Sequence, residues 1–281
     1  MDPKHELTIA RLKERKAARR QSEVAREVLD ALNRGWIESK NLVEWLSVDR
    51  LRLAKVVLPE LEMDEIDFQS LGQRLRGKSV LQQSKMLGAE LAQLLSPTDP
   101  RVKRLENHPS DVVREWGALI IGHWESMSFS RRLAWMKPYA DDRNPGTREI
   151  AWIALRQHVI DDPIEAVSKL MPWTGSRNER LRRYASEITR PCGVWCQHID
   201  ALKRDPAIAV TLLEPLKSDE ALYVRNSVAN WLNDASKTNP DWVIHLTNQW
   251  EKVSPSPQTR YIIKRALRTL TKNSSNPKNK T

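Results

Sequence analysis

An arginine recurs at a nearly constant spacing through the second half of this chain. Successive members follow one another after 34, 34, 43 and 35 residues, and they are Arg114, Arg148, Arg182, Arg225 and Arg260. Each arginine follows a polar loop and opens a run of apolar residues with the period of a helix. A second helical segment lies between each pair of arginines. Two helices in each repeat of about 35 to 45 residues predict a HEAT-like helical solenoid.

Such repeats must stack, because one helix pair cannot bury its apolar face alone. We therefore expect an all-α solenoid with a concave groove that is lined by the arginine-bearing helix of every pair. Only 9 glycines among 281 residues also favour helices over turns and strands. The sequence predicts a single solenoid over residues 1–273, with N-terminal helices at 1–100 and the repeats at 101–273. The polar segment 274–281 is expected to be disordered.

The charge balance points to a polyanionic partner. Lysine and arginine number 46 against 36 aspartates and glutamates, which gives a net charge of +10. Nucleic acid is the first candidate and an anionic membrane surface the second. No stretch reaches the roughly 20 apolar residues of a membrane span, and the first residues lack a signal-peptide pattern. A cytoplasmic protein is expected, associated with the nucleoid if its source is bacterial.

A basic cluster lies near the N-terminus, between Arg11 and Arg20. It is compatible with two interpretations, a solvated helix face or a patch that follows DNA phosphates. In the second case Lys13 or Arg15 would contact a phosphate.

An unusual polar stripe lies on the helix predicted over residues 223–234. Asn226, Asn230 and Asp234 follow one another at four-residue spacing, opposite an apolar stripe. Asparagine and aspartate are poor formers of helix interiors, so helix propensity does not explain them. The stripe favours contact with a polar ligand, and Trp231 lies beside it.

Three carboxylates lie on the repeated helices, at Glu149, Glu187 and Asp234. Because these helices stand side by side in a solenoid, the three carboxylates can face one cleft. The spacing alone favours a simpler alternative, in which Glu187 pairs with Arg183 one turn away. For Asp234 the alternative is a surface residue near the end of its helix.

Three of the eleven tryptophans lie beside the polar residues or in a loop, and they are Trp152, Trp195 and Trp231. Pro191 and Gly193 interrupt the helix before Trp195, so that its indole is expected on a loop. There it could stack on a base or a sugar. Cys192, Cys196 and His198 lack a second ligand set at zinc spacing, so we predict no metal site. No phosphate-binding glycine loop is present, and no cofactor is expected.

Three blocks of this sequence resemble the AlkC/AlkD superfamily of HEAT-like DNA alkylation repair glycosylases, and the AlkC branch is the more similar. The blocks are residues 182–191 followed by Trp195, residues 219–240, and residues 259–270. Together they make residues 110–272 similar to the catalytic part of that superfamily. The N-terminal hundred residues are similar only in their helical character.

The resemblance implies a monomeric enzyme of base excision repair that acts on alkylated double-stranded DNA. It would hydrolyse the N-glycosidic bond of cationic bases such as 3-methyladenine, without flipping the base fully out of the helix. The lesion range among 3-methyladenine, 3-methylcytosine and 7-methylguanine is left open. The rival interpretation is a non-catalytic HEAT-repeat scaffold that binds nucleic acid or protein in the same groove.

The resemblance also assigns roles to residues. The expected catalytic residues are Asp234, Glu187 and Glu149. The expected substrate-binding residues are Trp195, Trp152, Trp231, Arg182, Arg190 and Asn230. The expected contacts to the DNA backbone are Arg148, Arg225, Arg260 and Lys264. The sequence leaves open whether the repeated arginines contact DNA or bridge neighbouring repeats.

Overall fold

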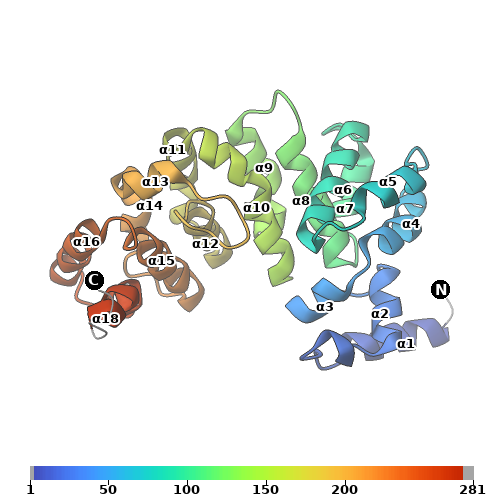
Figure 1. The fold of residues 1–281 in the computed structure, drawn as a ribbon, viewed down its shortest axis with the longest axis horizontal. Coiled ribbons are helices and arrows are strands. Elements are labelled where there is room, and N and C mark those ends of the chain that lie inside the picture. The colour runs from blue at the N-terminus through green and yellow to red at the C-terminus, as the bar shows by residue number, and fades with distance from the viewer. Residues whose placement is uncertain (1–2, 275–281) are drawn as a thin grey trace. The chain divides into compact units, whose positions relative to one another are not determined.

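The computed structural model describes residues 3–274, and this part of the chain is built from helices (Figure 1). It contains eighteen α-helices and three short 3-10 helices, at 21–23, 206–209 and 214–216, and no strand occurs among the described residues. The all-α, HEAT-like repeat fold predicted from the sequence is therefore confirmed. Of the predicted disordered segment, Ser274 ends the last helix and residues 275–281 lie outside the described part.

The chain divides into two compact units. The first comprises Met1–Met127 and Asp142–Ala154, and the second comprises Ser128–Asp141 and Leu155–Thr281. Within the first unit lie α1 (Pro3–Lys13), α2 (Arg26–Asn33), α3 (Leu42–Ser47), α4 (Arg50–Glu60), α5 (Phe68–Leu75), α6 (Val80–Leu94), α7 (Pro100–Glu106) and α8 (Asp111–His123). Helix α10 (Pro145–Asp161) contributes residues to both units.

The second unit contains the remaining helices. They are α9 (Phe129–Ala140), α11 (Pro163–Thr174), α12 (Glu179–Ile188), α13 (Asp200–Arg204), α14 (Val210–Leu213), α15 (Leu222–Ala235), α16 (Pro240–Val253), α17 (Pro257–Ala266) and α18 (Arg268–Ser274). Helices α12, α15 and α17 pack side by side in one layer, and α11, α14 and α16 cover them (Figure 1). The core lies between these layers, where Leu170, Leu212, Val228 and Ile262 are fully buried.

Proline and short polar residues set the helix starts in this unit. Pro163, Pro240 and Pro257 each occupy the first turn of a helix, where an amide N–H would have no partner within the helix. The side chain of Asn178 accepts a hydrogen bond from the backbone N–H of Arg180 and so caps α12. These caps fix where each repeated helix begins.

The recurrent arginine is the fourth residue of the second helix in each of the five pairs, α8, α10, α12, α15 and α17. In the first four helices its Nη1 atom donates to the two backbone carbonyls that lie six and five residues earlier. For Arg182 these are the carbonyls of Ser176 and Arg177, at 2.8 and 3.2 Å. Arg114, Arg148 and Arg225 repeat the pattern. The arginine thus closes the loop that leads into its own helix.

Two of these arginines also bridge to the loop of the following repeat within their unit. Arg182 binds both carboxylate oxygens of Asp219 at 2.6 and 2.9 Å, and Arg114 binds Asp142 in the same way. The bridging role that the sequence left open is therefore present for both residues. Arg260 differs, because it lies in an exposed ion pair with Glu251.

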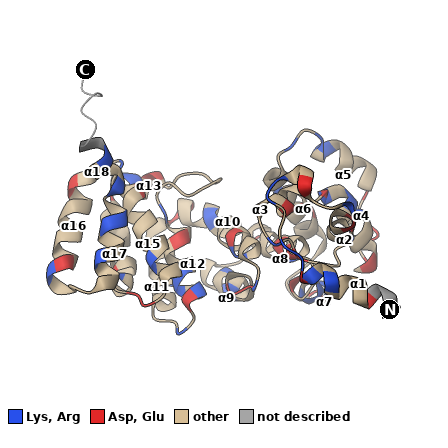
Figure 2. Cartoon of the chain, turned by 90° about the horizontal axis from the view of Figure 1, so that it is seen from below, with Lys and Arg blue, Asp and Glu red and all other residues tan. Residues whose placement is uncertain are grey.

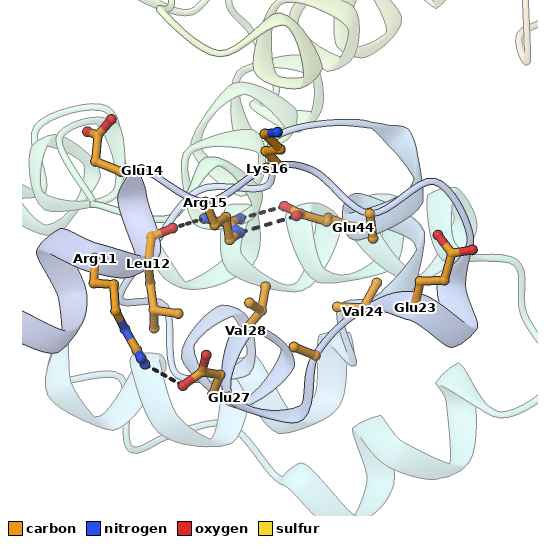
Figure 3. Close-up of a pocket in the computed structure, with 12 residues that line it drawn as sticks. Arg11, Leu12, Glu14, Arg15, Lys16, Glu23, Val24, Glu27, Val28 and Glu44 are labelled. Carbon is orange, nitrogen blue, oxygen red and sulfur yellow. Dashed lines mark hydrogen bonds and ion pairs between the residues drawn. The ribbon is translucent and has the colours of Figure 1, made fainter.

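The N-terminal basic cluster is held largely by acidic residues of the same unit (Figure 3). Arg15 is nearly buried against Glu44, with its Nη2 atom 2.5 Å from the carboxylate, and it also donates to the carbonyls of Leu12 and Glu38. Arg11 pairs with Glu27. The residues that make these contacts line a cleft of about 500 Å³. Arg15 therefore stabilises the N-terminal helices and is not available to a phosphate in this structure, whereas Lys13 is exposed.

The first unit contains a buried polar cluster on α8. Glu115 is fully buried and accepts from the indole N–H of Trp45 at 2.7 and 2.9 Å, while the Arg50 guanidinium lies 4.3 Å from the centre of the Trp45 ring. Burial, together with the neighbouring Asp111, raises the pKa of Glu115 to about 8. The carboxyl group therefore keeps its proton in the folded chain at pH values where it would be ionised in the unfolded chain.

This pKa shift predicts a pH dependence of stability. Between the ordinary pKa of 4.5 and about 8, the folded chain holds a proton that the unfolded chain has released, so the free energy of unfolding falls as the pH rises. In the Glu115→Gln variant this contribution is absent. We expect the variant to gain stability over the wild type as the pH increases from 5 to about 8, as measured by urea unfolding. A difference that stays constant with pH would contradict the raised pKa.

The repeated arginines predict a contrast in stability. Arg182→Met leaves the carboxylate of Asp219, whose side chain is only 5% exposed, without its partner, and we expect a loss of about 3 kcal/mol. Arg260→Met removes an ion pair whose side chains are 60% and 43% exposed, and less than about 1 kcal/mol should be lost. Urea unfolding measures both values. Equal losses would show that loop bridging does not stabilise the repeats.

Candidate active site

The candidate site lies where α12 and α15 end, in the second unit. Glu187 is on the last turn of α12, Arg190 lies two residues beyond the end of that helix, and Asp234 is on the last turn of α15. Since α12 and α15 pack side by side, their last turns bring the three side chains together. The buried hydroxyls of Ser186 and Ser227 lie at the same contact, 2.8 Å apart.

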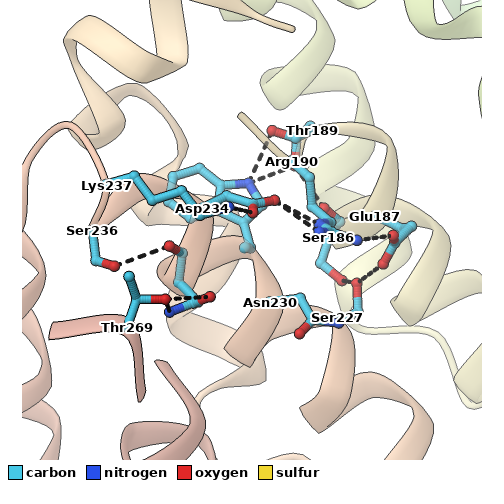
Figure 4. A network of polar contacts seen from close by, with 12 residues as sticks. Ser186, Glu187, Thr189, Arg190, Ser227, Asn230, Asp234, Ser236, Lys237 and Thr269 are labelled. Atoms are coloured by element: carbon cyan, nitrogen blue, oxygen red, sulfur yellow. Dashed lines mark hydrogen bonds and ion pairs between the residues drawn. The ribbon is translucent and has the colours of Figure 1, made fainter. Parts of the chain in front are cut away.

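Arg190 binds both carboxylates (Figure 4). Its Nη1 atom lies 2.6 Å from Oε1 of Glu187, and its Nε and Nη2 atoms lie 2.9 and 2.8 Å from Oδ2 of Asp234. Glu187 and Asp234 are each 4% exposed and Arg190 is 8% exposed. Two negative charges so close to each other require a cation between them, because one carboxylate would otherwise become protonated.

Glu187 is the more enclosed of the two acids. Burial acts to raise the pKa of its carboxyl group, but Arg183, Arg190 and a hydrogen bond from Ser227 outweigh burial and lower it. Oε2 of Glu187 accepts from the Ser227 hydroxyl at 2.7 Å. Arg183 also lies 3.6 Å away, so the pairing considered as the simpler alternative is present beside the bridge to Arg190. Glu187 is therefore an ionised carboxylate whose two oxygens are engaged by neighbouring side chains.

Asp234 differs from Glu187, because its second oxygen binds a lysine that is partly exposed to solvent. Oδ1 of Asp234 accepts from Nζ of Lys237 at 3.0 Å, and the Lys237 side chain is 47% exposed. A lysine with that exposure can turn into solvent at little cost. Asp234 is not the surface residue that was considered from its position near the helix end. It is a buried carboxylate with one oxygen that a ligand can reach by displacing Lys237.

Two of the predicted substrate-binding tryptophans are buried. Trp231 is 0% exposed and its indole N–H donates to the carbonyl of Thr189 at 2.9 Å. Trp152 is 1% exposed and donates to the carboxylate of Glu149 at 2.9 Å. Both rings lie in the core of this structure, and their predicted role in substrate binding stays a prediction. The large apolar area of an indole favours the core, and its N–H binds a neighbouring acceptor there.

Trp195 lies on an exposed loop, as the sequence predicted. The loop runs from 189 to 199 between α12 and α13, and the Trp195 side chain is 56% exposed. This loop accounts for the longest interval between repeated arginines, the 43 residues from Arg182 to Arg225. Burial first and the charge of Asp234 second raise the pKa of the Cys192 thiol, at the start of the loop.

The polar stripe of α15 contacts the next repeat. Asn226 accepts from the hydroxyl of Tyr261 at 2.8 Å, and Asn230 accepts from Arg268 at 3.0 Å. Arg182, predicted to bind substrate, is engaged by Asp219 in a partly buried ion pair with two hydrogen bonds. Lysine and arginine residues mark α17 in Figure 2. Lys264 is one of the exposed cations of this helix and forms no hydrogen bond or ion pair with the described residues.

Glu149 belongs to the other unit. It is on the second turn of α10, half-buried, and its carboxylate accepts from Trp152 of the same unit. Its predicted catalytic role stays a prediction. Arg148 and Arg225, predicted to contact the DNA backbone, use Nη1 to close their own loops.

The sequence did not single out Arg156, which donates to three carbonyls around the Trp195 loop. The sequence offered a partial indication of its importance, since Arg156 is a charged residue inside the apolar run of a helix. No group of three or more His, Cys, Asp or Glu side chains in the described part is arranged to hold a metal ion. Nor does any helix among the described residues have the length and apolarity that a membrane span needs.

Comparisons with known proteins bear on the fold and the superfamily. No family model matches the sequence. The uncharacterized protein YhaZ of Bacillus subtilis is 37% identical over 185 residues, which cover 65% of this chain and 47% of that protein. The chain thus spans about half the length of this curated relative.

Solved structures extend the comparison. The alkylpurine DNA glycosylase AlkC of Pseudomonas fluorescens, solved bound to DNA containing an abasic site analog, superimposes with a TM-score of 0.62 at 25% identity. The match covers 80% of this chain and 63% of AlkC. This chain belongs to the AlkC/AlkD superfamily. AlkD2 of Streptococcus mutans has the same fold as this chain, with a TM-score of 0.56 at 21% identity. That match covers 71% of this chain and 96% of AlkD2.

Proposed function

We propose that this AlkC/AlkD superfamily protein is a DNA glycosylase of base excision repair, of the AlkC branch. Its substrate is double-stranded DNA that contains cationic N-alkylated bases such as 3-methyladenine, and it acts as a monomer without a cofactor. The single observation that supports this best is the pair of buried carboxylates, Glu187 and Asp234, held on one guanidinium. The fold shared with the glycosylase AlkC supports the same assignment.

The chemistry of a cationic base suits two ionised acids. A base alkylated at N3 carries a positive charge, so it leaves as a neutral molecule when the bond from C1′ to nitrogen breaks with its electron pair. No general acid is required. Positive charge then develops on the sugar, and a nearby carboxylate stabilises it. Water adds to C1′ and loses a proton to a carboxylate or to solvent.

The contacts of the two acids divide these tasks. One oxygen of Asp234 binds the half-exposed Lys237, so we assign Asp234 to the reacting sugar and water. Both oxygens of Glu187 are bound by buried groups. We assign Glu187 to holding Arg190 in position and to adding to the negative potential at the site. Trp195, exposed on its loop, offers an indole face to the cationic base.

The tight packing supports attack on a base that is not fully flipped out. Glu187 and Asp234 are each 4% exposed, and Arg190 fills the space between them. A whole base does not fit between two carboxylates that share one guanidinium. The acids therefore approach the sugar from the helix ends rather than from the walls of a closed pocket.

A non-catalytic scaffold explains these residues less well. A groove that only binds phosphates gains nothing from buried carboxylates, which repel the DNA backbone. Bridging of α12 and α15 could be achieved by one buried acid and one arginine. The second acid and the exposed tryptophan favour an enzyme.

The decisive experiment measures base release. Methylated duplex DNA is incubated with the wild type, Asp234→Asn and Glu187→Gln, and free 3-methyladenine is quantified in single-turnover reactions. We expect Asp234→Asn to lose at least about 100-fold in rate, because it removes the charge nearest the sugar. Glu187→Gln should lose less. Glu149→Gln tests the remaining predicted acid in the same series.

Folding and DNA binding of each variant serve as controls, since removing one partner of a buried ion pair can cost about 3 kcal/mol. Wild-type protein that is folded and binds DNA but releases no base would refute the enzyme. Undiminished release by both variants would refute the assignment of the acids while leaving the reaction in place.

Lys264 provides a test of the DNA-binding face. If it contacts a phosphate, Lys264→Gln should lower the slope of log affinity against log salt by about 1 and weaken binding to all sequences alike. Lys252→Gln is the matched control, because it removes an exposed lysine from α16, the first helix of the same pair. Equal slopes in the two variants would assign Lys264 to solvent.

A further inference from the structure

The Trp195 loop is held in a backbone conformation that tryptophan rarely adopts. Trp195 has a φ of +59°, in the left-handed region, while its side chain remains 56% exposed. Bulky residues enter this region only where their surroundings impose it.

One buried arginine ties both ends of this loop together. Arg156, on α10 and 3% exposed, donates to the carbonyls of Ile188 and Arg190 at 2.6 Å each and to the carbonyl of Gln197 at 3.2 Å. The first two carbonyls lie at the end of α12, where backbone acceptors lack partners within the helix. The third carbonyl, that of Gln197, lies at the other end of the loop, shortly before α13. A hydrogen bond from the N–H of Ile199 to the carbonyl of Pro191, at 3.0 Å, closes the same loop.

The space inside the loop is filled. A Cβ atom on Gly193 would lie 2.5 Å from Sγ of Cys196 and 3.4 Å from Nη2 of Arg156. A side chain at this position would press on the Cys196 thiol, so that the thiol or the loop backbone would have to shift.

The partners of Arg156 distinguish it from the repeated arginines. The repeated arginines bind carbonyls of the loop that precedes their own helix, whereas Arg156 binds carbonyls at the two ends of the Trp195 loop, beyond α12. Burial lowers the pKa of this guanidinium, because its charged form loses contact with water. The hydrogen bonds to carbonyls must offset that desolvation free energy. The carbonyl of Arg190 is among these acceptors, and the side chain of Arg190 holds Glu187 and Asp234.

We propose that Arg156 is a positioning residue that fixes the exposed Trp195 and the acid-bridging Arg190 relative to each other through their backbone. It does not touch the substrate. It sets the distance between the indole that would meet the base and the carboxylates that would meet the sugar. This inference rests on the proposed glycosylase function for its catalytic consequence, but its structural part concerns the loop alone.

The test compares two independent ways of releasing the loop. Arg156→Met removes the three hydrogen bonds, Arg156→Lys retains a charge with fewer donors, and Gly193→Ala displaces the loop while Arg156 is intact. The control is Arg132→Met, which removes another buried arginine of the second unit, on α9.

Two readouts follow the loop directly. Amide hydrogen exchange over residues 189–199 should accelerate at least about tenfold in Arg156→Met and Gly193→Ala, and less in Arg156→Lys. Acrylamide quenching of Trp195 is taken as the difference between each protein and its Trp195→Phe partner, and it should increase in the same order. Unchanged exchange and quenching in both Arg156→Met and Gly193→Ala would overturn the proposal, as would equal changes in the Arg132→Met control.

A third readout connects the loop to the reaction. The single-turnover rate on methylated DNA should fall about tenfold or more in Arg156→Met, with a much smaller change in DNA affinity, because positioning affects the transition state more than binding. Arg156→Lys should recover part of the rate. If the wild type releases no base, the proposed function fails, and exchange and quenching alone decide whether Arg156 holds the loop. Should Arg156→Met fail to fold, Gly193→Ala carries the test.

Discussion

The repeat architecture depends on one recurrent interaction, an arginine that binds the carbonyls of its own preceding loop. A stack of helix pairs leaves many short loops whose backbone groups require partners. At the fourth position of a helix, a guanidinium reaches back to the carbonyls five and six residues earlier and closes the loop. Where the following loop supplies an aspartate, as at Asp142 and Asp219, the same side chain joins two repeats. The spacing of these arginines is thus a structural signal before it is a functional one.

The candidate site uses arginines that fall outside this period. Arg190 follows the end of α12 and binds two acids, and Arg156 lies in the middle of α10 and binds the carbonyls around the Trp195 loop. Both side chains are buried with their charge. The desolvation of a charge is offset only by several good hydrogen bonds, so each arginine restricts its neighbours closely. Precise placement of Glu187, Asp234 and Trp195 follows from these two restraints.

Sequence reasoning succeeded where periodicity or a polar loop carried the information. It identified α15 with its stripe and the loop position of Trp195, and it expected Glu187 and Asp234 to lie close together, as they do on either side of Arg190. It was less successful with tryptophans, because Trp152 and Trp231 lie beside polar residues in sequence and yet are buried. An indole ring can pack in an apolar core while its N–H binds one acceptor there. Polar neighbours in the sequence therefore do not show whether a tryptophan is buried or exposed. Arg15 and Arg182 were equally ambiguous, since a charge cluster does not reveal its partners.

The sequence by itself determined the all-helical repeat, because the arginine spacing and the apolar period are local properties of the chain. It also placed Asp234 near the end of its helix. Only the tertiary structure decided that Arg190 lies between these acids, that Asp234 is buried, and that Arg156 holds the Trp195 loop. Those facts depend on how helices far apart in sequence pack against each other. Hydrogen bonds of buried charges require distances that no spacing along the chain specifies.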